Sequence, residues 1–272
     1  MKALSILYHD VIDGDDFDSS GFPGPAAERY KLSAADFEKH LDAISRVLSS
    51  APAIVSELSA NESASKVLLT FDDGGASSPR IADMLEKRDW RGHFFITTDY
   101  IGKPNFVSAQ GIRDLRQRGH VIGSHSCSHP RRMSALSSEQ MFDEWRRSTE
   151  VLAQLIEEPV IIASVPRGNH SAGVARAAVK AGIKFLFTSE PTWRVNRVEG
   201  CWTLGRYGIL RGMPASASAG FAAGSFAPCL QQWIAWNLKK VLKNVGGNSY
   251  HRLRDLSLGE QAIADRSSGS AK

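Results

Sequence analysis

Two adjacent carboxylates, followed by two glycines, end an apolar stretch of this 272-residue chain. Residues 66–75 read KVLLTFDDGG, in which Val67 to Phe71 predict a buried strand with Asp72 and Asp73 at its carboxyl end. Neighbouring side chains on an extended chain point in opposite directions, so we expect the two carboxylates to serve different tasks. A plain acidic turn is the alternative interpretation, because Asp-Gly is a common turn dipeptide.

A second polar segment offers two histidines at a spacing typical of metal ligands. Residues 125–130 read HSCSHP, and His125 and His129 can converge on one ion. Asp73, at the end of another strand, supplies a third ligand. Such a set leaves positions open for water and substrate, which indicates catalysis rather than a structural role.

The elements that would position these residues alternate along the chain. Apolar runs predict strands at 3–8, 66–71, 93–98, 120–124, 160–163 and 184–188, and helices are expected to begin at Ser33, Ser78, Ser108, Ser137 and Ala172. Short connections favour right-handed crossovers, and hence a parallel sheet with helices outside it. Polar residues follow the carboxyl ends of the strands, where parallel α/β proteins build active sites. A loop rich in Gly, Pro and Asp at 13–30 is long enough to form a functional rim.

Composition limits the class of protein. A hydrophobic content of 42% over 272 residues suffices for one large α/β domain, and a net charge of +4 without basic clusters in the body of the chain argues against nucleic acid. Cys127, Cys201 and Cys229 are odd in number, which favours a reducing compartment. Residues 1–10 are too short and polar for a signal peptide. We therefore expect a cytoplasmic protein.

The sequence changes character after the expected sheet. We expect a barrel over 1–212, a low-complexity connection over 213–230, a helical segment over 231–258 and a disordered tail over 259–272. Residues 230–242 predict a basic amphipathic helix that ends near Lys239, Lys240 and Lys243. Its functional interpretation is contact with a partner or with an anionic membrane, at the inner face, and the alternative is docking on the barrel with solvated lysines. Docking is the favoured one, and the oligomeric state is not determined by the sequence.

The two motifs together identify a family resemblance. TFDDG at 70–74 and HSCSHP at 125–130 resemble the first two motifs of the polysaccharide deacetylases, the NodB-homology group in carbohydrate esterase family four. The resemblance covers about 66–193 and implies a distorted (β/α)7 barrel of that type. It implies that Asp73, His125 and His129 hold one divalent ion, Zn²⁺ first, with Co²⁺, Ni²⁺ or Mn²⁺ as alternatives. It also implies that Asp72 is the general base of an acetamide hydrolysis.

The remaining family motifs fit less well. The third reads Arg-x-Pro-x-Gly, whereas residues 164–168 read SVPRG, with Ser164 where an arginine normally orients the catalytic aspartate. Arg167 is the candidate substitute. The fourth motif is represented at most by Trp193, which either walls the acetyl pocket or packs in the core.

A Leu-x-His motif that carries the catalytic acid is missing after Trp193, since residues 205–210 read GRYGIL. Residues 6–9, ILYH, resemble that motif moved to the N-terminus, as in the circularly permuted poly-N-acetylglucosamine deacetylases. We therefore expect His9 to protonate the departing amine, with His170 as the alternative. His40, His93, His120 and His251 are interpreted as structural or surface residues.

The sequence thus predicts a metal-dependent hydrolase that removes N-acetyl or O-acetyl groups from an acetylated sugar, either a polysaccharide or its biosynthetic intermediate. Arg167, Trp193 and His170 are its predicted substrate-binding residues. The alternative is a non-catalytic relative that binds glycan or a partner through the retained cleft. This alternative stays open because Ser164 stands where the family has an arginine. A two-metal phosphoesterase is disfavoured, because the motifs hold one histidine pair and one acidic pair.

Overall fold

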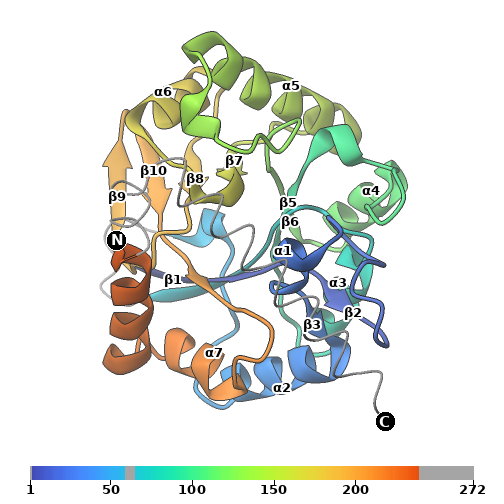
Figure 1. Ribbon diagram of the computed structural model, residues 1–272, viewed down its shortest axis with the longest axis vertical. Helices are drawn as coiled ribbons and strands as arrows, with labels where there is room; N and C mark the ends of the chain where they lie inside the picture. Colours follow the sequence, from blue (N-terminus) through green and yellow to red (C-terminus); the bar gives the residue numbers. More distant parts are fainter. Residues whose placement is uncertain (1, 59–64, 239–272) are drawn as a thin grey trace.

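The computed structural model describes residues 2–58 and 65–238, which fold around one curled nine-stranded sheet (Figure 1). The strand order is β11-β1-β4-β5-β6-β7-β8-β10-β9, and a short pair, β2-β3, lies apart from it. The strands are β1 (Ala3–Tyr8), β2 (Val11–Ile12), β3 (Leu32–Ser33), β4 (Lys66–Phe71), β5 (His93–Ile96), β6 (Val121–Ser124), β7 (Ile162–Ser164), β8 (Phe185–Phe187), β9 (Val195–Val198), β10 (Cys201–Leu204) and β11 (Tyr207–Gly208).

The pairing of the strands confirms the predicted distorted barrel. Every neighbouring pair in the large sheet is parallel except β10 with β9. β1 pairs with β4 in the register Tyr8 to Phe71, so His9 and Asp72 leave the sheet side by side. Parallel alignment therefore brings the polar strand ends to one edge of the sheet.

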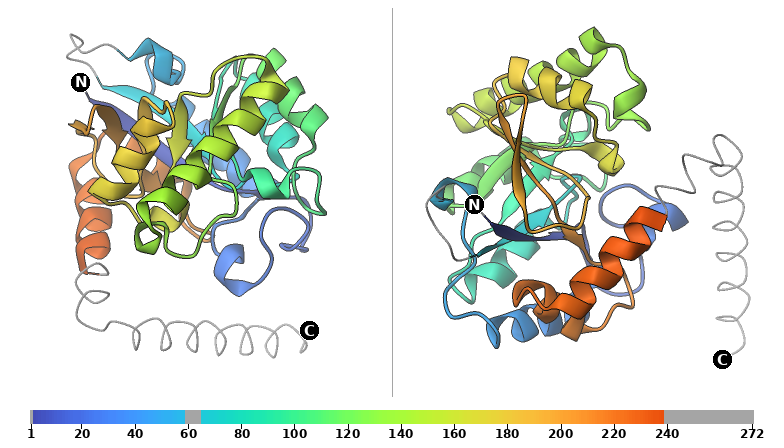
Figure 2. Two further views of the ribbon diagram at one scale, coloured as in Figure 1. Left: turned by 90° about the horizontal axis from the view of Figure 1, so that it is seen from above. Right: turned by 90° about the vertical axis from the view of Figure 1, so that its left-hand side faces the viewer.

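Helices cover the outside of the sheet, as the alternating pattern predicted (Figure 2). They are α1 (Pro25–Glu28), α2 (Ala34–Ser45), α3 (Ser78–Glu86), α4 (Ala109–Gln117), α5 (Ser138–Ile156), α6 (Ala172–Lys180) and α7 (Ala215–Ala222), with short 3₁₀ turns at Val55–Glu57, Thr98–Tyr100, Met133–Ala135 and Pro166–Gly168. The predicted caps of α2, α4 and α5 form, and Ser137 with Gln140 makes a full capping box. The helix expected to be capped by Ser78 instead has Ser77 at its N-cap.

The segment after the barrel is more folded than a low-complexity connection. α7 lies within the predicted connection of 213–230, and its Phe221 and Ala222 are buried in the main core. Residues 226–238 are helical, so the last described helix begins before the predicted 231. The many small residues of α7 allow this helix to pack closely. From composition alone, the same residues indicated a low-complexity connection. The predicted Lys239, Lys240 and Lys243 face, His251 and the tail of 259–272 lie outside the described residues.

The cysteines and three of the histidines interpreted as structural lie in the core. Cys127, Cys201 and Cys229 are buried free thiols. His40, His93 and His120 are buried and hydrogen-bonded within the fold. Among the residues that the structure describes, no helix is both long and apolar enough to cross a membrane.

His93 is expected to make stability depend on acid. Its Nε2 accepts the Val55 amide at 2.9 Å, and Nδ1 lies 2.9 Å from the Leu69 carbonyl, so a second ring proton would face a donor. Burial is the main reason that the pKa of His93 falls to about 4. In the unfolded chain His93 binds a proton with a pKa of 6.5, whereas in the folded chain its pKa is about 4. The free energy of unfolding therefore decreases as the pH falls from about 6.5 to about 4.

The loss assigned to His93 approaches about 3 kcal/mol at the acid end of that window. Urea unfolding at pH 7 and pH 4 should show a smaller drop for His93→Gln than for the parent chain. An identical drop in both proteins would contradict this assignment.

Candidate active site

The three predicted ligand residues converge on one point. His125 Nε2 lies 3.4 Å and His129 Nε2 lies 3.5 Å from Asp73 Oδ1, and the three donor atoms are within 4.8 Å of one another. Ligands about 2.1 Å from a tetrahedral ion stand about 3.4 Å apart. The spacing of the donors therefore fits a divalent ion such as Zn²⁺.

Local backbone conformation produces this convergence. Asp73 has a φ of 76° and His129 a φ of 56°, both in the left-handed region that few non-glycine residues adopt. The turn at Asp73 redirects its side chain, so Asp72 and Asp73 face the same cluster instead of opposite sides. Asp72 Oδ2 is 3.9 Å from His125 Nε2. The alternation of side chains holds for an extended chain and does not apply at Asp73, so the different tasks expected of the two carboxylates do not follow from opposite directions.

His125 is oriented by the neighbouring strand. Its Nδ1 donates to the Ser164 carbonyl at 3.0 Å, which leaves the Nε2 lone pair directed at Asp73. Burial lowers the pKa of His125, but the carboxylates of Asp72 and Asp73 outweigh burial and raise it overall. For His129 burial dominates, and its pKa falls to about 4. The lone pair of His129 is therefore free to bind an ion at neutral pH, whereas at His125 an ion must displace the ring proton that the carboxylates favour.

An arginine that the sequence reasoning missed holds Asp72. Arg206 Nη1 and Nη2 donate to the two Asp72 carboxylate oxygens at 2.7 and 2.8 Å, in a fully buried pair. Ser164 Oγ donates to Asp72 at 3.0 Å and accepts from Arg206 at 2.8 Å. Ser164 thus lies between Asp72 and an arginine that comes from the connection between β10 and β11.

The β10–β11 connection aims Arg206 into the barrel. A Cβ on Gly205 would lie 2.3 Å from the Glu190 carbonyl oxygen, so glycine allows this close approach, and the Arg206 amide then donates to that carbonyl. Arg206 Nε donates to the Thr188 carbonyl at 3.0 Å. The sequence signal was an arginine just after an apolar strand, in the GRYGIL segment that was examined only for a histidine.

Charge balance keeps Asp72 ionised. Burial works against the charged form, but Arg206 first and His125 second outweigh it, so the pKa of Asp72 lies below its usual value. Burial likewise opposes ionisation of Asp73, and hydrogen bonding from His125 with the charge of His129 holds its pKa well below the ordinary range. Both groups are carboxylates at neutral pH.

The predicted catalytic acid, His9, lies at this site. It follows β1 beside Asp72, and its protonated charge would lower the pKa of both Asp72 and Asp73. Its ring packs 4.8 Å from that of Tyr30, and Nδ1 is buried without a hydrogen-bond partner among the described residues. Because Nδ1 of His9 has no hydrogen-bond partner among the described residues, it is available to form a hydrogen bond with a substrate.

The 13–30 loop forms one wall of the site, as its composition predicted. The Phe22 ring lies 4.6 Å from the His129 ring and contacts Tyr100 and Phe106. Lys31 Nζ fixes the loop by donating to the Phe17 and Phe22 carbonyls at 2.6 and 2.7 Å. Phe22 therefore restricts the ring of one predicted ligand.

One of the predicted substrate residues, Arg167, is near this cluster. Arg167 has a φ of 55°, and its charge contributes to lowering the pKa of His129. It does not replace the family arginine, because Arg206 fills that position against Asp72. His170 follows the same turn after β7, and the roles of His170 and Arg167 toward substrate stay predictions.

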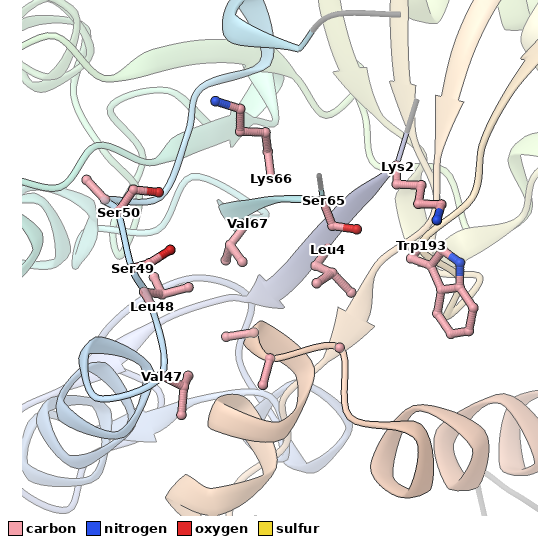
Figure 3. Close-up of a pocket in the computed structure, with 14 residues that line it drawn as sticks. Lys2, Leu4, Val47, Leu48, Ser49, Ser50, Ser65, Lys66, Val67 and Trp193 are labelled. Atoms are coloured by element: carbon pink, nitrogen blue, oxygen red, sulfur yellow. The ribbon is translucent and has the colours of Figure 1, made fainter. Parts of the chain in front are cut away.

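Of the two interpretations of Trp193, packing against the core agrees with its position, whereas a wall of an acetyl pocket beside Asp72 does not. The Trp193 carbonyl accepts the Ala3 amide at 3.0 Å, at the amino end of β1, about 20 Å along the strand from His9. Figure 3 shows Trp193 beside Lys2 and Leu4 in a cavity of about 440 Å³. That cavity lies at the opposite end of the strands from the carboxylates. β9 runs antiparallel to β10 and begins beside the amino end of β1, where Lys2 pairs with Arg194, and the linear order of the motifs did not reveal this.

Glu144 on α5 is expected to strengthen metal binding. Its carboxylate accepts the Cys127 and Ser128 amides, both at 2.9 Å, and the Ser128 hydroxyl at 2.6 Å. These bonds fix the segment between His125 and His129. We expect Glu144→Gln to weaken Zn²⁺ affinity by about 10-fold, the low end for groups that orient ligands.

Competition with a chromogenic chelator measures that affinity directly. Glu139→Gln, on the exposed first turn of the same helix, is the matched control and should bind as the parent does. Equal affinity of the Glu144 and Glu139 variants would contradict a role in holding the loop.

Comparison with known proteins gives a consistent result. Residues 59–186 match the polysaccharide deacetylase family. The chain is 27% identical over 139 residues to peptidoglycan-N-acetylmuramic acid deacetylase PdaA of Bacillus subtilis, which covers 49% of this chain and 51% of that protein. The chain thus spans about half the length of the curated relatives it matches.

Solved structures share the fold. IcaB from Ammonifex degensii superposes with a TM-score of 0.65 at 21% identity, covering 82% of this chain and 97% of that one. The deacetylase PplD of Streptococcus pyogenes, in complex with acetate, gives 0.62 at 16% identity over 79% and 96% of the two chains. At these identities the likeness concerns the fold alone.

Proposed function

Because residues 59–186 of this chain match the polysaccharide deacetylase family, we propose that it is a metal-dependent hydrolase that removes N-acetyl groups from an acetylated carbohydrate. One observation carries the proposal. The converging donors of Asp73, His125 and His129 stand next to a carboxylate, Asp72, that Arg206 keeps ionised.

The residues around the cluster divide the work of amide hydrolysis. When bound, the divalent ion supplies Lewis-acid polarisation of an acetyl carbonyl and of a water molecule. Asp72 accepts the proton of the attacking water, because its carboxylate is ionised and fixed by Arg206 and Ser164. His9, at the end of the neighbouring parallel strand, delivers a proton to the departing amine nitrogen.

The position of Arg206 argues against the non-catalytic alternative. That alternative rested on Ser164 in place of the family arginine, and Arg206 supplies the guanidinium from the connection between β10 and β11. The carboxylate retains the partner that a working base requires, so this observation favours the enzyme.

Release of acetate and of a free amine tests the function. Purified full chain loaded with Zn²⁺ should deacetylate N-acetylglucosamine oligomers or peptidoglycan fragments, lose activity with a chelator and recover it when Zn²⁺ returns. His125→Ala should lose both metal and activity. Acetate release without new amine would instead indicate an O-acetyl substrate, and a reconstituted protein that binds no metal would overturn the proposal.

Substrate location is part of the same proposal. We expect the substrate to be a cytoplasmic biosynthetic intermediate, such as a nucleotide- or lipid-linked sugar. Assays with each class, beside finished polymers, test this expectation. Activity confined to long chitin or peptidoglycan would count against it.

His9 is expected to matter most for poor leaving groups. Replacement by alanine should lower kcat on an N-acetylated sugar by about 100-fold, the low end for general acid catalysis. The same variant should keep most of its rate on an aryl acetate, because a phenolate departs without protonation. His170→Ala is the matched control and should not show this split. A split in His170→Ala but not in His9→Ala would reverse the assignment.

A further inference from the structure

The last described helix, residues 226–238, turns most of its large apolar side chains outward. Five side chains are exposed, by 72% for Phe226, 37% for Leu230, 46% for Trp233, 45% for Ile234 and 59% for Leu238. Their spacing places them on one face of the helix. We call these five residues the apolar stripe.

A different face of this helix attaches it to the domain. Cys229 is buried, and Gln232 pairs with β11, donating to the Gly208 carbonyl at 2.8 Å and accepting its amide at 2.9 Å. The helix is therefore anchored at the edge of the domain (Figure 2, red), while the side chains of the apolar stripe are exposed. Docking on the barrel, the favoured interpretation of the sequence, accounts for the anchored face only.

The apolar surface continues beyond the helix. Phe226, Leu230 and Trp233 line one side of a groove of about 270 Å³, and Trp193 and Tyr207 contribute to the rest of its lining. Arg194 stands on the same groove and is exposed. An occupant must therefore offer apolar groups and accept a nearby positive charge.

The charge of this part of the sequence identifies the occupant. No Asp or Glu occurs between Glu199 and Asp255, whereas Lys239, Lys240, Lys243, Arg252 and Arg254 follow the stripe. An apolar face with tryptophan beside lysines is the composition of helices that lie in the interface of anionic membranes. Polybasic segments add attraction to the negative headgroups.

We propose that the apolar stripe binds the surface of an anionic phospholipid bilayer, with the groove beside it receiving acyl or headgroup groups. The proposal does not depend on the proposed deacetylase activity, because its surface lies outside the catalytic cluster. It gives the enzyme access to substrates held at a membrane.

Vesicle co-sedimentation of the full chain tests the proposal. Vesicles with about 30% phosphatidylglycerol should retain the protein, pure phosphatidylcholine vesicles should not, and added salt should weaken retention. Phe226→Ser with Leu238→Ser should reduce partitioning at least about 10-fold, since both remove exposed apolar area. Because both side chains are mostly exposed, thermal stability should hardly change.

A matched variant controls for surface hydrophobicity in general. Val151→Ser with Val179→Ser removes two exposed apolar residues, 39% and 36% exposed, from α5 and α6, and should bind as the parent does. Equal binding of the stripe variant, or retention by neutral vesicles alone, would overturn the proposal. So would a parent chain that is dimeric by light scattering and becomes monomeric in the stripe variant, because a second copy would then cover the stripe.

Discussion

Asp72→Asn is expected to lower kcat on an N-acetylated sugar by about 1000-fold while Zn²⁺ affinity stays unchanged. The amide has nearly the shape of the carboxylate but cannot accept the proton of the attacking water. Metal affinity should persist, because the ligand set is Asp73, His125 and His129. Steady-state kinetics and chelator competition on the same preparation measure both quantities.

The neighbouring aspartate is the matched control for this variant. Asp73→Asn should weaken Zn²⁺ binding, since Asp73 Oδ1 stands 3.4 and 3.5 Å from the two imidazole nitrogens. The opposite pattern, with metal lost in Asp72→Asn and retained in Asp73→Asn, would exchange the two roles. Retention of more than a tenth of the parent kcat by Asp72→Asn would show that another group is the base.

Arg206 is expected to have the second large effect, on both rate and stability. Arg206→Met leaves the Asp72 carboxylate buried without its guanidinium, which should lower the free energy of unfolding by about 3–5 kcal/mol. Arg206→Lys keeps the charge but cannot bind both carboxylate oxygens, so we expect about a 100-fold loss of kcat/KM from misplacement of the base. Urea unfolding and steady-state kinetics measure these effects.

The pH profile separates a positioning role from a merely structural one. The charge of Arg206 lowers the pKa of Asp72 in the parent, so its weaker contact in Arg206→Lys should raise that pKa. Because the base must be ionised, the acidic limb of kcat/KM should move to higher pH. An unchanged profile and rate would contradict the assignment.

A double variant that exchanges the residues at positions 164 and 206 tests whether Arg206 takes the place of the family arginine expected at 164. Ser164 Oγ lies 2.8 Å from Arg206 Nη2, so a guanidinium brought from position 164 would reach the same region. Ser164→Arg combined with Arg206→Ser should recover part of the activity that Arg206→Ser alone loses. Ser164→Arg alone should be harmful, because two guanidinium groups would then compete for one carboxylate.

The sequence by itself determined the parallel sheet and its reactive edge. Apolar runs with carboxylates or histidines after them are local signals, and parallel pairing brings such ends together whatever the loops do. For that reason Asp72, Asp73, His125 and His9 were found correctly as neighbours, and the capping signals placed α2, α4 and α5.

Only the tertiary structure decided which groups support them. Arg206 meets Asp72 across 134 residues of sequence, and no local pattern encodes a contact between two loops on different strands. The left-handed turn at Asp73 similarly overrode the alternation expected of an extended chain. Trp193 kept a family position in the sequence yet lies at the far end of β1, because the path of the chain, rather than the order of motifs, fixes which edge a residue reaches.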